Sequence, residues 1–149
     1  MNEGPPNRTQ FRHFTPVPVQ WGEMDMLGHV NNVVFIRYAE TGRIAYFDQM
    51  LGNDPDIWGG EGPILAEIQC RFIRQLRYPA QLEIGTRAIK IGSRSLAIEC
   101  AIFRKDEDSP VATSRAAIVW FDYRQQKAVP VPQRLRDTIR GFESVAPEE

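Results

Sequence analysis

A long helical pattern with small residues on its inner side is the feature that most constrains the fold of this chain. Between about Val33 and Met50, apolar residues recur at steps of three and four, opposite charged ones, which is typical of an amphipathic helix. The inner side includes Ala39, Gly42 and Ala45. Because small residues allow another backbone to approach closely, we expect a sheet to curl around this helix.

The hydrophobic period changes to two after a Gly- and Asp-containing loop at residues 51–62. Alternating apolar and polar residues are typical of half-buried strands, and four segments show them: 64–73, 82–88, 96–102 and 111–123. An extended segment at residues 14–21 holds two prolines, so we expect it at a sheet edge. A short helix with Leu135, Ile139 and Phe142 is predicted near the C-terminus.

This order of elements predicts an α+β fold in which a five-stranded antiparallel sheet wraps one long central helix. We expect a disordered N-terminal tail at residues 1–12, one folded domain at residues 13–143 and a C-terminal tail at residues 144–149. A single helix leaves one sheet face and the sheet edges open. Pairing with a second copy is the simplest remedy.

The composition excludes several classes of protein. The formal net charge of −1 argues against a broad nucleic-acid footprint. No segment has the length and apolar character of a membrane span or signal core, so we expect a cytoplasmic protein without a membrane partner. Cys70 and Cys100 lie in separate strand-like runs and are expected to be reduced. With only His13 and His29 and no clustered cysteines, no metal site is predicted.

The segment Trp21–Asn32, WGEMDMLGHVNN, carries the candidate chemistry. It places the carboxylate of Asp25 before a glycine turn at Gly28, and this turn leads into the predicted helix. Asn31 or Asn32 is well placed to cap the helix. A helix N-terminus collects unpaired N–H donors and the positive end of the helix dipole. A carboxylate beside such donors is suited to attack on a polarised carbonyl.

With these residues the chain resembles the 4-hydroxybenzoyl-CoA thioesterase family, which has the hotdog fold. The resemblance spans most of residues 17–140. The residues that carry it are Trp21, Asp25, Gly28, His29-Val30-Asn31-Asn32, Tyr38, Glu40, Arg43, Ile91-Gly92-Ser93-Arg94-Ser95, Ala112-Thr113 and Val119-Trp120-Phe121-Asp122. Glu23 stands where many relatives have Asp, and Gln20 where many have a basic residue; both flank the candidate site.

The resemblance implies hydrolysis of an acyl-CoA thioester without a metal or organic cofactor. Asp25 would act as general base on water or as nucleophile on the carbonyl, and both roles stay open. The backbone N–H of Asn32 would hydrogen-bond the thioester oxygen. Active sites of this family lie between two subunits, so a homodimer or homotetramer is expected.

Several residues have both a functional and a structural interpretation. Gly28 and His29 are assigned to substrate binding, although a structural role for His29 is favoured. The turn Gly92, Ser93, Arg94 and Ser95 would contact the CoA phosphates, or it is a plain hairpin turn. Trp58, in the long loop, would close over the acyl chain or plug the core.

Other charged residues have simpler interpretations. Glu40 is interpreted as an ion-pair former, with Arg43 as a candidate partner. Arg71, Arg74 and Arg77 would lie in one row on a strand face, either solvated or near the nucleotide.

Two alternative functions remain. One is a thioesterase for acyl groups on acyl-carrier protein, and the other is a non-catalytic acyl-CoA-binding protein on the same fold. Thiol release distinguishes them, because a binding protein releases no thiol and a carrier-specific enzyme ignores free CoA esters. The acyl group itself is not predicted by the sequence.

Overall fold

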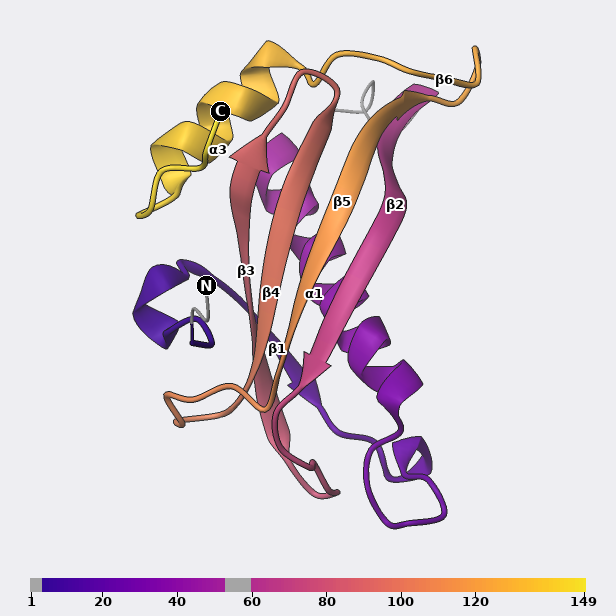
Figure 1. Ribbon diagram of the computed structural model, residues 1–149, viewed down its shortest axis with the longest axis vertical. Helices are drawn as coiled ribbons and strands as arrows, with labels where there is room; N and C mark the ends of the chain where they lie inside the picture. The colour runs from indigo at the N-terminus through magenta and orange to yellow at the C-terminus, as the bar shows by residue number, and fades with distance from the viewer. Residues whose placement is uncertain (1–3, 53–59) are drawn as a thin grey trace.

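The computed structural model describes residues 4–52 and 60–149. A curled antiparallel sheet holds one long helix, α1 (Asn32–Leu51), against its concave face (Figure 1). The strands follow the order β1-β3-β4-β5-β2, and β6 pairs with β5. The remaining bounds are β1 (His13–Pro18), β2 (Glu61–Phe72), β3 (Gln81–Ile91), β4 (Ser95–Arg104), β5 (Ala112–Asp122), β6 (Lys127–Ala128) and α3 (Gln133–Phe142).

The predicted α+β class and the long central helix are confirmed, and so is the short C-terminal helix. The sheet differs from the five-stranded prediction by the two-residue strand β6. Its shortness explains why periodicity did not reveal it, since two residues cannot display an alternating pattern. Across the described ranges, no helix combines the length and apolar character needed to cross a membrane.

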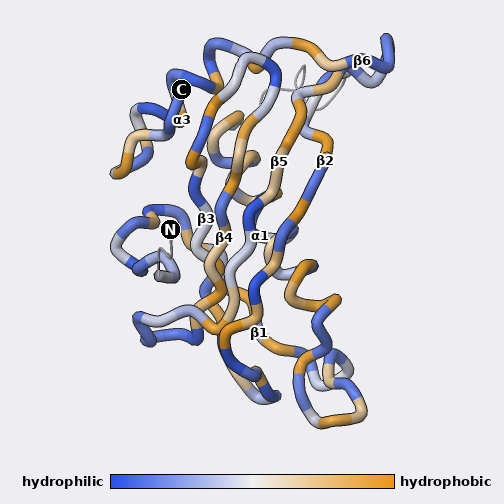
Figure 2. Tube along the Cα trace, viewed as in Figure 1, coloured by the Kyte–Doolittle hydropathy of each residue, from blue (hydrophilic) through white to orange (hydrophobic). Residues whose placement is uncertain are grey.

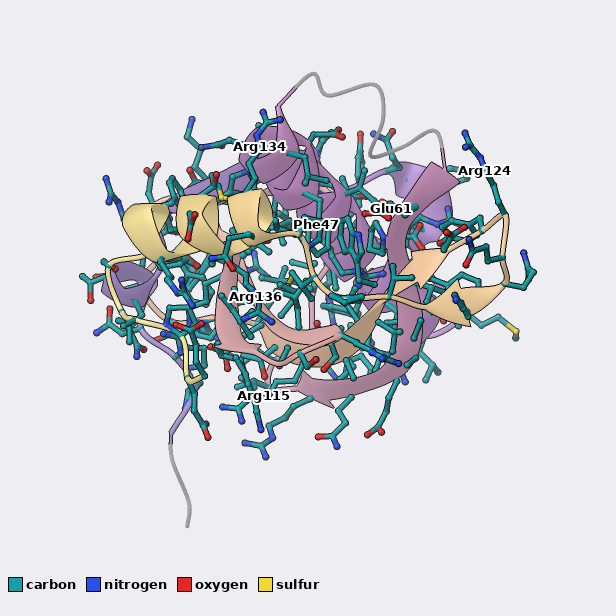
Figure 3. The ribbon with its side chains drawn as sticks, turned by 90° about the horizontal axis from the view of Figure 1, so that it is seen from above. Phe47, Glu61, Arg115, Arg124, Arg134 and Arg136 are labelled. Atoms are coloured by element: carbon teal, nitrogen blue, oxygen red, sulfur yellow. The ribbon has the colours of Figure 1, made fainter. Side chains whose placement is uncertain are left out.

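At Gly42 the backbone of the helix lies very close to the sheet. A Cβ at this position would lie 2.6 Å from Ile84 Cγ2 and 2.8 Å from Thr86 Oγ1. The expectation that small residues allow close approach is therefore confirmed at Gly42. Seen from above, Phe47 lies between α1 and the sheet, whereas Arg115 projects from the opposite face (Figure 3). We call these the inner and the outer face of the sheet.

The N-terminal segment packs on the outer face. Arg8–Gln10 form a 3-10 turn, and Arg8 Nη1 donates to Glu83 Oε1 at 3.0 Å. Phe11 is buried, and a Cβ on Gly85 would lie 2.9 Å from its ring. The prediction of disorder is wrong for this segment, because these side chains find partners on strands that are distant in sequence.

The last residues lie along β3. Glu148 forms a parallel bridge with Lys90; its N–H donates to Ile89 O at 2.9 Å, and its carbonyl accepts from Ile91 N at 2.8 Å. The register of β1 with β3 ends at Thr86. The C-terminal segment therefore covers the part of β3 that β1 leaves open.

Strand β2 forms an edge of the sheet and exposes apolar side chains. Ile64 is 38% exposed, Leu65 41% and Phe72 44%. A register shift interrupts the pairing with β5 between Leu65 and Glu67, and Figure 2 shows apolar and polar residues interspersed along β2. Apolar side chains on an open sheet edge are the kind of surface that another chain covers.

Candidate active site

A tight turn between β1 and α1 holds the Asp25 carboxylate. Oδ1 of Asp25 accepts from Leu27 N at 2.9 Å and from His29 N at 3.4 Å. The backbone closes the same turn, because Asp25 N donates to His29 O at 2.8 Å and Gly28 N to Asp25 O at 3.1 Å. Gly28 has φ +78°, a left-handed backbone conformation that residues with a side chain rarely adopt and that glycine adopts readily. Two backbone donors therefore orient the carboxylate, which is exposed to solvent.

The start of α1 leaves one backbone donor free beside this turn. Asn31 is the N-cap residue, and its side chain accepts from Val33 N at 3.0 Å. Asn31 N donates to Glu23 O at 3.0 Å, and Val34 N to Asn31 O at 2.9 Å. A helix start presents four N–H groups without helical acceptors. Within the described residues three of them have acceptors, and the one left is the N–H of Asn32.

His29 has a partner that its sequence neighbourhood does not reveal. Its Nε2 lies 3.1 Å from Arg77 Nη2. Since a guanidinium only donates, Nε2 is the acceptor and Nδ1 carries the proton. A ring held in this way by the segment between β2 and β3 fits the structural role favoured from the sequence.

Glu23 connects the loop between β1 and α1 to the helix α1 by hydrogen bonds. Its Oε1 accepts from Tyr38 Oη at 2.8 Å and from Gln20 N at 2.6 Å. Burial raises the pKa of the Tyr38 hydroxyl far above its ordinary value, and the neighbouring Glu23 raises it further. Tyr38 is therefore a hydrogen-bond donor throughout the physiological range. From the sequence, Glu23 was expected only at the flank of the site, because its contact with Tyr38 joins residues that are 15 positions apart.

A cavity of about 330 Å³ is lined by Asp25, His29 and Asn32 together. Its volume is at the lower end of the range of small-molecule sites. Phe35 and Phe72 give it an apolar part, with ring centroids 5.5 Å apart. The lining consists of Asp25, Leu27, His29, Val30, Asn32, Phe35, Phe72, Ile73, Arg74, Gln75 and Leu76. The structure thus brings together the predicted residues Asp25, His29 and Asn32, and no signal in the sequence pointed to Gln75.

The turn Gly92–Ser95 lies at the other end of the sheet. Ser95 is in register with Val119, which pairs with Ile64, whereas the cavity lies at Phe72. From Ile64 to Phe72 strand β2 covers about 25 Å at roughly 3.3 Å per residue. Within one chain this turn and Asp25 therefore do not form one site.

The carbonyls of the turn are held by neighbouring segments. Trp120 N donates to Arg94 O at 2.9 Å, and Val131 N to Ser93 O at 3.0 Å. The guanidinium of Arg136 donates to Gly92 O and to Ser93 O. The turn is thus fixed by β5, the segment before α3 and α3 itself.

Two interpretations of charged side chains are wrong. Arg43 is buried, and no ion pair joins it to Glu40 within the described residues. The three arginines do not form one row. Arg71 is in β2, Arg74 donates to Ser109 O at 2.7 Å, and Arg77 reaches His29. Both interpretations assumed that residues close together on one element interact with one another. In the structure, the partners of Arg74 and Arg77 come from segments that are distant in sequence. Trp58 lies outside the described residues.

Residues 19–139 match the thioesterase-like superfamily. The chain therefore belongs to this superfamily, its curled sheet around a central helix is the hotdog fold, and its class is that of a thioester hydrolase.

Two solved structures and one relative illustrate what this chain is similar to. The PA5185 protein of Pseudomonas aeruginosa has a TM-score of 0.84 and 30% identity, covering 95% of this chain and 98% of its own. A thioesterase of Thermus thermophilus solved with coenzyme A and zinc has a TM-score of 0.77 and 29% identity over 91% and 97%. The acyl-acyl carrier protein thioesterase ATL2 of Arabidopsis thaliana is 25% identical over 88% of this chain and 70% of its own.

Proposed function

We propose that this protein hydrolyses the thioester of an acyl-CoA, with Asp25 and the Asn32 N–H as the chemical groups. The observation that carries the proposal is that Asn32, whose N–H has no acceptor among the residues that the structure describes, lines the same cavity as Asp25. A carbonyl oxygen gains negative charge as its carbon is attacked. A helix-start N–H in line with the helix dipole stabilises that charge.

Two routes use this pair of groups. As general base, Asp25 takes a proton from water while the water oxygen bonds to the thioester carbon. The tetrahedral oxyanion then collapses, the C–S bond breaks and the CoA thiolate leaves. As nucleophile, Asp25 bonds to the carbon itself, the thiolate leaves, and water hydrolyses the resulting anhydride. In both routes the Asn32 N–H donates to the carbonyl oxygen.

The comparisons support CoA as the carrier, because the Thermus thermophilus thioesterase was solved with coenzyme A. A second candidate, an acyl-carrier-protein thioesterase, is supported by the relative from Arabidopsis thaliana. This chain is 29% identical to the CoA-bound protein and 25% identical to the acyl-carrier-protein thioesterase. We therefore place acyl-CoA first.

A second copy would complete the site. Antiparallel pairing of β2 with β2 of a partner reverses the ends of the sheet, so the partner's turn Gly92–Ser95 would lie at the same end as Asp25. It would also cover the apolar side chains that β2 exposes, among them Ile64 and Phe72. In that arrangement the hydroxyls and the guanidinium of the turn are available to the CoA phosphates. We propose a homodimer as the smallest active unit, with a homotetramer as its extension.

The first test is thiol release from short, medium, long and aromatic acyl-CoA esters. It compares wild type, Asp25→Asn and Asp48→Asn. The Asn variant keeps the size of Asp25 but removes its charge, and Asp48 is an exposed residue of α1 that controls for loss of an acidic group. We expect turnover of at least one ester by wild type and Asp48→Asn, and loss of most of it in Asp25→Asn. Binding without thiol release by wild type would leave only a binding protein. Release from acyl-carrier protein alone would favour the second candidate.

A further inference from the structure

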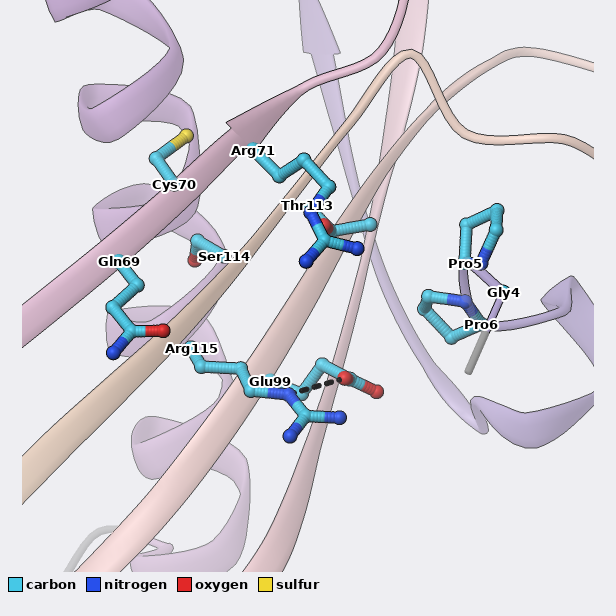
Figure 4. A pocket seen from close by; sticks show the side chains of 10 residues that line it. All are labelled: Gly4, Pro5, Pro6, Gln69, Cys70, Arg71, Glu99, Thr113, Ser114 and Arg115. Carbon is cyan, nitrogen blue, oxygen red and sulfur yellow. Dashed lines mark hydrogen bonds and ion pairs between the residues drawn. The ribbon is translucent and has the colours of Figure 1, made fainter. Parts of the chain in front are cut away.

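A second cavity lies on the outer face of the sheet, away from the candidate active site. It has a volume of about 390 Å³. One wall is formed by β2, β4 and β5, and the other by the N-terminal residues Gly4, Pro5 and Pro6 (Figure 4). Polar and charged side chains of the sheet face it: Gln69, Arg71, Glu99, Thr113 and Arg115.

A buried carboxylate sets the charge of this cavity. Glu99 is 2% exposed. Its Oε1 accepts from Arg87 Nε at 2.9 Å and lies 2.8 Å from Arg87 Nη2. Its Oε2 accepts from Arg115 Nε at 3.1 Å. Glu99 is thus ion-paired with both arginines, and the three groups together carry one net positive charge.

Arg71 adds a second positive charge. It makes no hydrogen bond or ion pair with the part of the chain that the structure describes. Arg71 is opposite Thr113 and Arg115 is opposite Gln69 in the register of β2 with β5. The two arginines are thus diagonal neighbours on one face, about 7–8 Å apart at the backbone. In Figure 4 both guanidinium groups reach across the same wall of the cavity.

The opposite wall is held in place by its own anchors. Arg8 pairs with Glu83 at 3.0 Å, and Phe11 packs on Gly85. These contacts attach the segment that directly follows Pro5 and Pro6 to the outer face of the sheet.

We propose that this cavity binds a small molecule through a phosphate or pyrophosphate group. The cluster of Arg71, Arg87, Arg115 and Glu99 has three positive charges and one negative charge, which leaves an excess that matches a dianion. Guanidinium groups bind phosphate oxygens with paired, charge-assisted hydrogen bonds, and the Thr113 hydroxyl adds a donor. This cavity lies on the outer face of the sheet and does not include Asp25.

The test titrates inorganic pyrophosphate into the full-length protein by calorimetry. It compares wild type, Arg71→Gln, Arg115→Gln and Arg37→Gln. Arg37 is exposed on α1, on the far side of the sheet, and controls for the lost charge. We expect binding by wild type and Arg37→Gln, and an affinity about tenfold lower or weaker still in the other two. Equal binding by all four proteins, or no binding by wild type, would overturn the proposal.

Folding and ligand source are tested separately. Because the side chain of Arg71 makes no hydrogen bond or ion pair with another described residue, Arg71→Gln keeps the test valid if Arg115→Gln unfolds. A parallel titration with CoA tests the source of the phosphate group. If the group belongs to CoA, both cavity variants bind CoA more weakly. If it belongs to another metabolite, only the binding of pyrophosphate becomes weaker. Hydrolysis of an acyl-N-acetylcysteamine, which has no phosphate, should be unchanged in both variants. This readout separates failure of the phosphate site from failure of the hydrolase.

Discussion

The hydroxyl of Tyr38 donates to the Glu23 carboxylate at 2.8 Å, and this bond joins the second turn of α1 to the loop in front of it. Glu23 is also the residue whose carbonyl accepts from Asn31 N at 3.0 Å. One residue therefore holds the loop to the helix by its side chain and by its backbone. The position of Asp25 relative to the helix start depends on this connection.

Replacing Tyr38 by Phe should lower turnover of the preferred ester, because the loop that carries Asp25 loses its side-chain anchor. The matched control is Tyr46→Phe, since Tyr46 is also a buried tyrosine of α1 that donates to a carboxylate, Glu143, at 3.1 Å. Each variant should lose about 1.5–3 kcal/mol of unfolding free energy. Only Tyr38→Phe should also lower kcat, and equal kcat values in the two variants would contradict the positioning role.

Asn32→Pro should remove the proposed oxyanion donor with little harm to the helix. Asn32 is the first residue of α1, where proline is favoured, and Asn31 has φ −62° and ψ 140°, a conformation that residues before proline prefer. We expect kcat to fall about 10²–10³-fold. Asn32→Ala keeps the N–H and should retain most activity, so similar losses in both variants would assign the effect to the side chain.

Gly42→Ala should destabilise the protein although alanine is the better helix former. The new Cβ would meet Ile84 Cγ2 at 2.6 Å, and overpacking of this kind costs about 1–3 kcal/mol. Gly141→Ala in α3 is the control, because nothing lies within 4 Å of the new Cβ; it should stabilise by up to about 1 kcal/mol. Urea denaturation of both variants measures these opposite signs, and stabilisation by both would show that the helix can shift away from β3.

Glu143 should make the protein less stable as pH rises. Burial raises the pKa of its carboxyl above the ordinary 4.5, so the folded state keeps a proton that the unfolded state releases. The free energy of unfolding contributed by this group therefore falls between pH 4.5 and the raised pKa. Glu143→Gln cannot ionise, so its stability relative to wild type should increase across this window and then level off. Denaturation at a series of pH values, with Glu40→Gln as exposed control, checks this; a constant difference would exclude it.

Cys100 should resist thiol reagents in the folded protein. Burial raises the pKa of its thiol to about 11 from 9.0, which by itself lowers the thiolate fraction near neutral pH about 100-fold. In a Cys70→Ser variant, modification by an aromatic disulfide reagent should be slower by at least this factor in buffer than in denaturing urea. The half-buried Cys70, tested in Cys100→Ser, should react faster than Cys100. Comparable rates for the two thiols would indicate local opening around β4.

Local patterns predicted most of the elements and part of the site. The three- and four-residue period predicted α1, and the close approach at Gly42 followed from its size. The turn at Gly28 and the cap at the helix start were also readable, because they depend on residues that are adjacent in sequence.

The rest depends on contacts between distant residues. Arg77 meets His29, Phe11 packs on Gly85, and Glu99 joins Arg87 to Arg115. A periodic pattern shows which residues share a face of an element, but not which face of another element they meet. For the same reason the sequence did not reveal that, within one chain, the turn at Gly92 lies at the other end of the sheet from Asp25.

The strand order also has a consequence for how the chain folds. Strands β3, β4 and β5 follow one another as hairpins. By contrast, β1 pairs with β3 across a long segment that includes α1 and β2, and β2 pairs with β5 across the segment that holds β3 and β4. Local pairings form before those that must close long loops, so the three-stranded meander should form early and the outer strands should close on the helix late. Substitutions in the meander are then expected to slow folding, and those in β1 or β2 to speed unfolding.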